Sequence, residues 1–221
     1  MSNKLVIYGA GPLAELMHYH FVHETDYEVV AFCLDQQFIT KSSLCGLPIV
    51  PFETISTSHP HTSHNMFVAI GYSSMRNRKL MFDKAKAKNY RLVNFISKTA
   101  GIRENLIIGE NNLIQARVEI EPFANIGNNN IFWTGSILGH HFTIGDHNYI
   151  AGNCGFGGYC TMGNMCFMGN AAVTVNNVHI ADETYMVSGT VILRDTEPFA
   201  KYHGNPCKLV SRHQETGIII Q

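Results

Sequence analysis

An apolar residue recurs at every sixth position from Ile108 to Ile192, without any change of phase. Fourteen of the fifteen positions are apolar, and only Thr174 interrupts the series. A six-residue period matches neither the period of an α-helix nor the two-residue alternation of a flat strand. A fixed repeat of this kind indicates a solenoid. The series consists of Ile108, Ile114, Ile120, Ile126, Phe132, Leu138, Ile144, Ile150, Phe156, Met162, Met168, Thr174, Ile180, Met186 and Ile192.

The repeat fits a parallel β-helix of triangular section, in which each hexapeptide forms one side. The apolar residue points into the prism, where it stacks on its counterparts one coil above and below. A small residue is expected four places later, where the chain turns toward the next side. Fifteen hexapeptides make five coils, a rod of roughly 24 Å at about 4.8 Å between strands. The small-residue position holds Val118, Ala124, Ser136, Cys154, Cys160, Cys166, Ala172, Val178, Thr184 and Thr190.

Glycine and asparagine are concentrated near the expected corners. Both residues tolerate positive φ at little cost, so we predict that they form the turns between sides. Glycine directly follows seven of the inward positions. Asparagine occupies several further positions near the corners. These residues are Gly109, Gly127, Gly139, Gly145, Gly157, Gly163 and Gly169, with Asn111, Asn112, Asn128, Asn129 and Asn130.

The amino-terminal part of the chain has a different pattern, in which short apolar runs alternate with amphipathic stretches. This alternation predicts a small parallel α/β sheet of Rossmann-like type. We expect strands at 5–8, 27–34, 47–50, 66–70 and 91–96, and helices at 12–22 and 73–88. The predicted organisation is a Rossmann-like domain at 1–97, a β-helix at 98–210 and a carboxyl-terminal tail at 211–221.

A glycine turn follows the first expected strand. Gly9-Ala10-Gly11 with Ala14 satisfies the loose pattern GxGxxA, and Asp35 directly follows the second strand. This pattern places a phosphate at the start of a helix, as in dinucleotide sites. The segment is short for a full dinucleotide fold, which needs two mononucleotide halves. A nucleotide monophosphate or a diphosphate-sugar fits half of such a fold equally well, and we favour a sugar nucleotide over NAD partly because of the family resemblance described below.

Composition excludes several classes of function. The net charge is −1 and only 15% of residues are charged, which argues against a nucleic-acid partner. No apolar stretch of about 18 residues and no signal-peptide core is present, so we expect a soluble cytoplasmic protein without a membrane partner. Cys154, Cys160 and Cys166 occupy the small-residue position, six residues apart rather than in a CxxC pair. We therefore expect structural cysteines and no metal site.

A short Rossmann-like segment followed by hexapeptide coils resembles the bacterial sugar-nucleotide acetyltransferases, the group of sialic acid O-acetyltransferases and bacillosamine N-acetyltransferases. The resemblance covers about residues 3–210 and implies a left-handed parallel β-helix. It rests on YGAGPLAE at 8–15, Asp35, AIGY at 69–72, the hexapeptides, LGHHFTIGD at 138–146 and HGNPCK at 203–208.

The resemblance also implies a catalytic histidine. The family motif [ILV]-x-H-x-x-x-I-G matches residues 138–145 and places His140 at the histidine position. The next residue is commonly acidic in the N-acetyltransferases and can orient the imidazole, whereas here it is His141. His141 is the competitor for the role of base. Histidine suits proton transfer near neutral pH. No cysteine lies in a nucleophile motif, so we predict direct attack without an acyl-enzyme.

Cofactor and substrate residues follow from the same resemblance. Proteins of this family are homotrimers that bind acetyl-CoA between neighbouring β-helices. The implied cofactor residues are Gly169, Asn170, Ala171, Ser188, Gly189 and Lys208. Small residues also belong at coil corners, and a terminal lysine can simply be solvated, so both readings stay open. The implied substrate residues are Gly9, Gly11, Pro12, Leu13, Asp35 and Gly71, with Pro12 and Leu13 replacing a glycine and a histidine of the family loop.

The favoured function is acetyl-CoA-dependent N-acetylation of a nucleotide-linked amino sugar in surface-glycan or lipopolysaccharide synthesis. O-acetylation of a sugar or of sialic acid is the alternative within the same enzyme class. A non-catalytic hexapeptide-repeat scaffold or sugar-nucleotide sensor is the alternative outside it.

Overall fold

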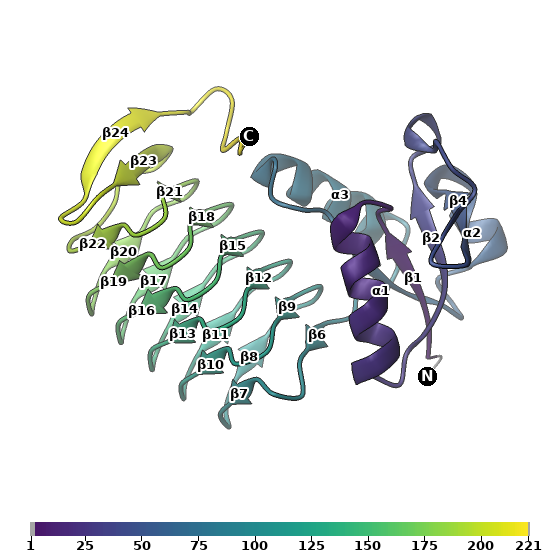
Figure 1. Ribbon diagram of the computed structural model, residues 1–221, viewed down its shortest axis with the longest axis horizontal. Coiled ribbons are helices and arrows are strands. Elements are labelled where there is room, and N and C mark those ends of the chain that lie inside the picture. The colour runs from purple at the N-terminus through teal and green to yellow at the C-terminus, as the bar shows by residue number, and fades with distance from the viewer. Residues whose placement is uncertain (1–2, 221) are drawn as a thin grey trace. The chain divides into compact units, whose positions relative to one another are not determined.

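The computed structural model describes residues 3–220, which divide into two compact units (Figure 1). One unit comprises the chain up to Gly71 together with Leu80–Asn94. The other comprises Tyr72–Lys79 together with the chain from Phe95 onward.

The first unit is built on a five-stranded sheet of order β3-β4-β2-β1-β5. Strands β4, β2, β1 and β5 are parallel, and β3 is antiparallel to β4. The strands are β1 (Lys4–Tyr8), β2 (Glu28–Leu34), β3 (Ser43–Leu44), β4 (Leu47–Pro51) and β5 (Asn65–Val68). The helices are α1 (Pro12–Glu24), η1 (Gln36–Phe38), η2 (Phe52–Thr54), α2 (Ile55–Ser58) and α3 (Met75–Ala87), of which the residues from Leu80 onward belong to this unit.

Alternation of side chains along β1 gives this sheet two buried faces. Val6 and Tyr8 belong to a core cluster with Ile55 of α2 and Phe82 of α3. On α1, Phe21 is fully buried and meets Phe67 of β5 edge to face at 5.2 Å. The sheet is therefore covered by helices on both sides, as an α/β sheet requires. The strand expected at 91–96 is absent from it: Leu92 makes only an isolated bridge, and the following strand belongs to the other unit.

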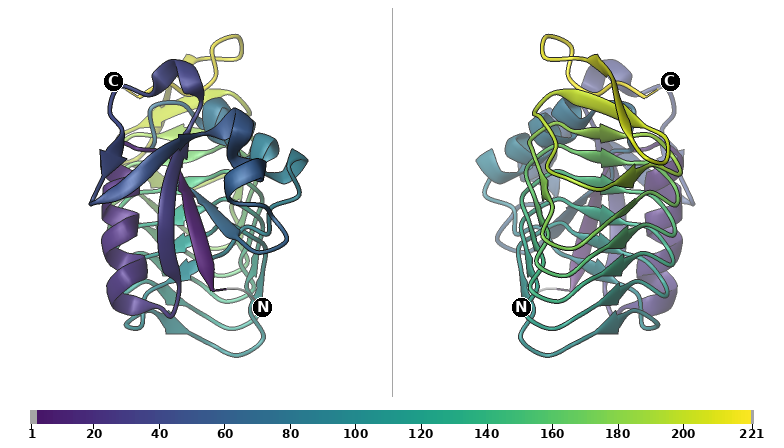
Figure 2. Two further views of the ribbon diagram at one scale, coloured as in Figure 1. Left: turned by 90° about the vertical axis from the view of Figure 1, so that its right-hand side faces the viewer. Right: turned by 90° about the vertical axis from the view of Figure 1, so that its left-hand side faces the viewer.

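The second unit is a parallel β-helix whose two-residue strands stack in three sheets (Figures 1 and 2). This arrangement fits the expected left-handed β-helix. Two strands, β6 (Phe95–Ile96) and β7 (Gly101–Ile102), precede the first hexapeptide of the apolar series. One sheet contains β7 (Gly101–Ile102), β10 (Glu119–Ile120), β13 (Ile137–Leu138), β16 (Gly155–Phe156), β19 (Val173–Thr174) and β22 (Val191–Ile192). A second contains β8 (Ile107–Ile108), β11 (Asn125–Ile126), β14 (Thr143–Ile144), β17 (Thr161–Met162) and β20 (His179–Ile180).

The third sheet is the longest. It contains β6 (Phe95–Ile96), β9 (Leu113–Ile114), β12 (Ile131–Phe132), β15 (Tyr149–Ile150), β18 (Phe167–Met168), β21 (Tyr185–Met186), β23 (Ala200–His203) and β24 (Lys208–Arg212). The last pair, β23 and β24, is antiparallel and closes this end of the sheet.

The interior of the β-helix is formed by the apolar series, as predicted. Its members from Ile114 onward are at most 8% exposed, Thr174 included. Thr174 is tolerated because its hydroxyl oxygen accepts a hydrogen bond from the Gly157 backbone N–H at 3.2 Å. The thiols of Cys154, Cys160 and Cys166 donate to backbone carbonyls at 3.0–3.2 Å, in agreement with structural roles.

The corners differ from the expected glycine and asparagine turns. A residue with positive φ lies three places after each inward position from Ile108 to Met186, and this position holds large side chains such as Phe123, His141 and Tyr159. Asn111 and Asn129 do take this conformation. The glycines that follow the inward positions do not have positive φ. Glycine is required there because the next coil lies too close to leave room for a β-carbon. A β-carbon on Gly139 would lie 2.8 Å from backbone atoms of the next coil. The positions 112, 130 and 148 form a buried asparagine ladder instead of a turn.

The carboxyl-terminal segment packs against Tyr72–Lys79 within the second unit. Arg76 binds the carboxylate of Glu183, with Nε 3.0 Å from Oε2, and donates to the carbonyl oxygens of Gln214 and Glu215. Ile218 is buried, and Ile219 forms a bridge with Ser74. Among residues 3–220, no helix is long and apolar enough to cross a membrane.

Candidate active site

His140 and His141 lie side by side at one edge of the β-helix. They follow β13, and the chain turns at His141, whose φ is 57°. Both side chains are exposed, and their Nδ1 atoms are 3.1 Å apart. In this hydrogen bond one of the two Nδ1 atoms carries a hydrogen and donates, and the other accepts through its lone pair. The two histidines that the sequence singled out as candidates for the base are therefore adjacent and exposed to solvent at this edge.

Aromatic rings from neighbouring coils hold this pair. The His141 ring lies between Phe123, one coil before it, and Tyr159, one coil after it, at centroid distances of 4.7 and 4.6 Å. The His140 ring meets Tyr159 edge to face and lies over Gly158, where a β-carbon would be 2.8 Å from its Nε2. Phe123 and Tyr159 are 56% and 54% exposed, so this edge presents an unusual stripe of apolar surface.

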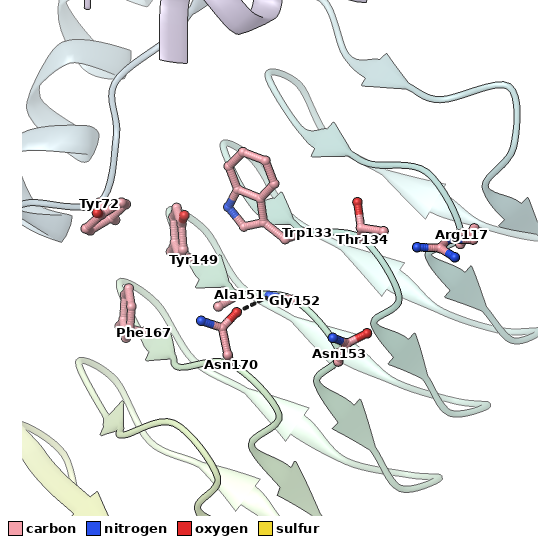
Figure 3. A pocket seen from close by; sticks show the side chains of 10 residues that line it. All are labelled: Tyr72, Arg117, Trp133, Thr134, Tyr149, Ala151, Gly152, Asn153, Phe167 and Asn170. Carbon is pink, nitrogen blue, oxygen red and sulfur yellow. Dashed lines mark hydrogen bonds between the residues drawn. The ribbon is translucent and has the colours of Figure 1, made fainter. Parts of the chain in front are cut away.

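A pocket of about 480 Å³ lies on a different edge, after the strands of the third sheet (Figure 3). Figure 3 shows aromatic side chains at one end of it and Arg117 at the other. The aromatic residues are Tyr72, Trp133, Tyr149 and Phe167. Burial raises the pKa of Tyr149 to about 12, so its hydroxyl stays a neutral donor across the physiological range.

Of the expected cofactor residues, Asn170 lines this pocket. Its side-chain oxygen accepts a hydrogen bond from the Gly152 N–H at 3.0 Å, which leaves its amide N–H groups for other partners. Gly169 and Gly189 have structural reasons for being small. A β-carbon on Gly169 would lie 2.5 Å from the Ser188 nitrogen, and Gly189 has a φ of 71°. Ala171 occupies a corner with positive φ, and Lys208 is exposed at the start of β24.

Sequence reasoning missed the aromatic lining of this pocket. A signal was present, because Tyr149 and Phe167 are one coil apart and stack with their rings 5.2 Å apart. Outward positions repeat with the coil just as inward ones do, so an aromatic column could have been found. Tyr72 had no such signal, because it lies outside the hexapeptides and meets Tyr149 only in the folded unit.

The expected substrate residues of the first unit gather at one edge of its sheet. Gly9, Asp35 and Gly71 come after β1, β2 and β5, which are parallel neighbours. Gly9 has a φ of 135°, and a β-carbon there would lie 2.6 Å from the Ala69 carbonyl oxygen. Gly11 precedes α1, Pro12 is its first residue and Leu13 the next, so the loop opens at a helix start. Free space surrounds the positions of Gly11 and Gly71.

Asp35 is already engaged by protein groups. It is 6% exposed, and its two oxygens accept hydrogen bonds from the Tyr8 hydroxyl and from the Lys84 ammonium group. Burial by itself would raise the pKa of Asp35, but the bonds from Lys84 and Tyr8 outweigh burial and lower it. The carboxylate is therefore held in its charged form and fixes the start of the loop after β2.

This network predicts a pH-dependent contribution to stability. Because the pKa of Asp35 is lower when folded than its unfolded value of about 3.9, its contribution is present above about pH 4 and is lost as pH falls through the folded value. We expect Asp35→Asn to reduce the free energy of unfolding by about 1–3 kcal/mol at pH 7 and by less at pH 3. Urea unfolding of both proteins at the two pH values measures this difference. An equal loss at both pH values would contradict it.

No metal site is evident in the part of the chain that the structure describes. No group of three or more histidine, cysteine, aspartate or glutamate side chains is arranged to hold a metal ion among these residues.

Similar solved structures provide the context for this site. The chain matches a variant of the perosamine N-acetyltransferase of Caulobacter crescentus in which a histidine is replaced by asparagine, solved in complex with CoA and GDP-perosamine, with a TM-score of 0.84 and 24% identity over 94% of this chain and 97% of that one. A variant of that enzyme, in which a histidine is replaced by alanine, matches at 25% identity and a TM-score of 0.84, with the same coverage of both chains.

The acetyltransferase domain of PglB from Neisseria gonorrhoeae, in complex with acetyl coenzyme A, matches with a TM-score of 0.85 and 19% identity over 95% of this chain and all of that one. WeeI from Acinetobacter baumannii matches with a TM-score of 0.62 and 18% identity over 93% of this chain and 99% of that one. No protein-family profile matches the chain. The chain thus shares, over more than nine-tenths of its length, the fold of acetyltransferases that include one solved with CoA and a nucleotide-linked amino sugar.

Proposed function

We propose that this chain is an acetyl-CoA-dependent N-acetyltransferase of a nucleotide-linked amino sugar. The observation that carries the proposal is the full-length match to an N-acetyltransferase bound to CoA and GDP-perosamine, together with an exposed histidine pair at an edge of the β-helix. The substrate of that neighbour favours an amine over a hydroxyl as acceptor.

Direct transfer accounts for the chemistry with few groups. His140 accepts a proton at Nε2 as the sugar amine attacks the thioester carbonyl, and the new C–N bond gives a tetrahedral oxyanion. A backbone N–H of the β-helix edge stabilises the oxyanion. The C–S bond then breaks, and the imidazolium returns the proton to the departing thiolate. No acyl-enzyme forms, because the cysteines of the β-helix core are buried and donate to carbonyls.

Two copies of the chain are needed to assemble this site. The histidine pair lies on the edge after the first sheet, whereas Asn170 and the aromatic pocket lie on the edge after the third. We propose a homotrimer in which the histidine edge of one β-helix faces the pocket edge of the next. The exposed stripe of Phe123 and Tyr159 supports such contact. CoA then passes Asn170, and Gly9, Gly11 and Gly71 of the first unit line the nucleotide, while Asp35 positions the adjacent loop through Tyr8 and Lys84.

The decisive experiment is thiol release from acetyl-CoA with a panel of UDP-, GDP- and dTDP-linked amino sugars. We expect turnover with at least one amino sugar and none with the matched sugar that carries a hydroxyl in place of the amine. Trp133 is the single tryptophan and lines the pocket, so its fluorescence reports CoA binding separately. Turnover of the hydroxyl compound would establish O-acetylation. Sugar-nucleotide binding without any turnover would establish a scaffold or sensor.

A further inference from the structure

The two histidines of the edge differ in how firmly they are held. His141 is fixed by its neighbours: its ring stacks on Tyr159 at an interplanar angle of 20° and packs on Phe123, and its backbone N–H donates to the Pro122 carbonyl at 3.0 Å. His140 is flanked on one side by Gly158, which offers no side chain. The Nδ1 atom of His141 therefore lies at a fixed position next to the Nδ1 atom of His140.

We infer that His141 is a positioning residue, which accepts a hydrogen bond from Nδ1–H of His140 and so keeps Nε2 of His140 free to take the substrate proton. The inference rests on the proposed function. A neutral imidazole carries one proton, on either nitrogen. A proton on Nδ1 of His140 leaves the lone pair on Nε2, which is the atom the mechanism uses. His141 then carries its own proton on Nε2.

The hydrogen bond between the two histidines also stabilises the imidazolium form of His140. When His140 has accepted the substrate proton, both of its nitrogens are protonated, and Nδ1–H still donates to neutral His141. The proton then leaves Nε2 for the thiolate, and the pair returns to its starting state. His141 thus does the work that a carboxylate does beside other catalytic histidines, without adding a negative charge. The titratable groups on adjacent coils of this edge are Glu121, whose N–H bonds to the Leu138 carbonyl, and Tyr159.

The chain itself suggests the matched variants. His141→Phe keeps an aromatic ring between Phe123 and Tyr159 but removes the acceptor. Phenylalanine is tolerated in this backbone conformation, because Phe123 adopts it one coil earlier with a φ of 66°. His141→Asn keeps an acceptor, because the asparagine Oδ1 can replace the histidine Nδ1. Asparagine also adopts positive φ readily. Thermal melting of both variants checks that the β-helix is intact.

We expect His141→Phe to lower kcat about 10- to 100-fold with little change in KM for acetyl-CoA, because a misplaced base costs about this much. His141→Asn is expected to retain most of the activity. If the asparagine variant is as impaired as the phenylalanine variant, or if the phenylalanine variant keeps wild-type kcat, the inference is wrong.

A second measurement needs no turnover and so separates this inference from the proposed function. Nitrogen-15 chemical shifts of the imidazoles, assigned by comparison with His140→Ala, report which nitrogen of His140 carries the proton. We expect Nδ1 in the wild type and a shift of population to Nε2 in His141→Phe. A wild-type His140 protonated on Nε2 overturns the inference, even if the enzyme turns over. If His140 is protonated on Nδ1 but the protein shows no turnover, the pairing of the two histidines is supported and the proposed function is wrong.

Discussion

His140→Ala is expected to lower kcat by about 10²- to 10⁴-fold, the usual contribution of a general base. The loss should appear in kcat and not in CoA binding, because His140 does not line the pocket that contains Asn170. Steady-state thiol release measures the rate, and Trp133 fluorescence measures CoA binding in the same preparation. Assembly mass should not change, because the substitution leaves the apolar stripe of Phe123 and Tyr159 intact.

A second histidine provides the matched control for this experiment. His179 is also exposed and lies in β20, on a different sheet, where its Nδ1 is 2.8 Å from the Thr161 hydroxyl. His179→Ala should leave the rate within about twofold of wild type. If His140→Ala retains activity, the base is His141, and the roles within the pair are reversed.

Gly157→Ala is expected to destabilise the β-helix by about 1–3 kcal/mol, the usual cost of overpacking. A β-carbon at this position would lie 2.5 Å from the backbone nitrogen of Asn176 and 2.6 Å from the carbonyl carbon of Val175. Backbone of the next coil cannot move away without breaking its own ladder bonds. Thermal melting at matched protein concentration measures the effect, since an oligomer's midpoint depends on concentration.

The neighbouring Gly155→Ala is the control. It lies two residues earlier, in β16, and its β-carbon would meet only the side chain of Val173, 3.4 Å from Cγ1 and 4.0 Å from Cβ, which are ordinary contacts. We expect a change within about 0.5 kcal/mol. Equal effects of the two substitutions would show that loss of glycine, and not contact between coils, determines stability here.

Several features of the chain could be predicted from the sequence alone. The hexapeptide series specified the β-helix, because inward residues must repeat with the coil for their side chains to stack. The histidine at 140 could be proposed from its motif, and its exposure follows from its place after an inward residue. The sheet of the first unit followed from alternating strands and helices, although the run at 91–96 contributed its last strand to the β-helix.

The corner conformations were predicted less well. Glycine was expected to supply positive φ, but stacking of coils, invisible in a single hexapeptide, is what requires glycine after the inward residue. Backbone bonds to the preceding coil hold residues such as His141 and Tyr159 at positive φ, so the corner accepts side chains. Because the corner tolerates large side chains, aromatic rings can lie around the histidine pair.

The sequence by itself determined the architecture, because a period of six is a local property that every coil repeats. Only the tertiary structure decided the contents of the candidate sites. Tyr72 meets Tyr149, and Lys84 meets Asp35, across long stretches of chain. The contact between His140 and His141 also depends on the tertiary structure, although the two residues are adjacent in sequence. The orientation of each ring is set by Phe123, Gly158 and Tyr159 from the coils above and below.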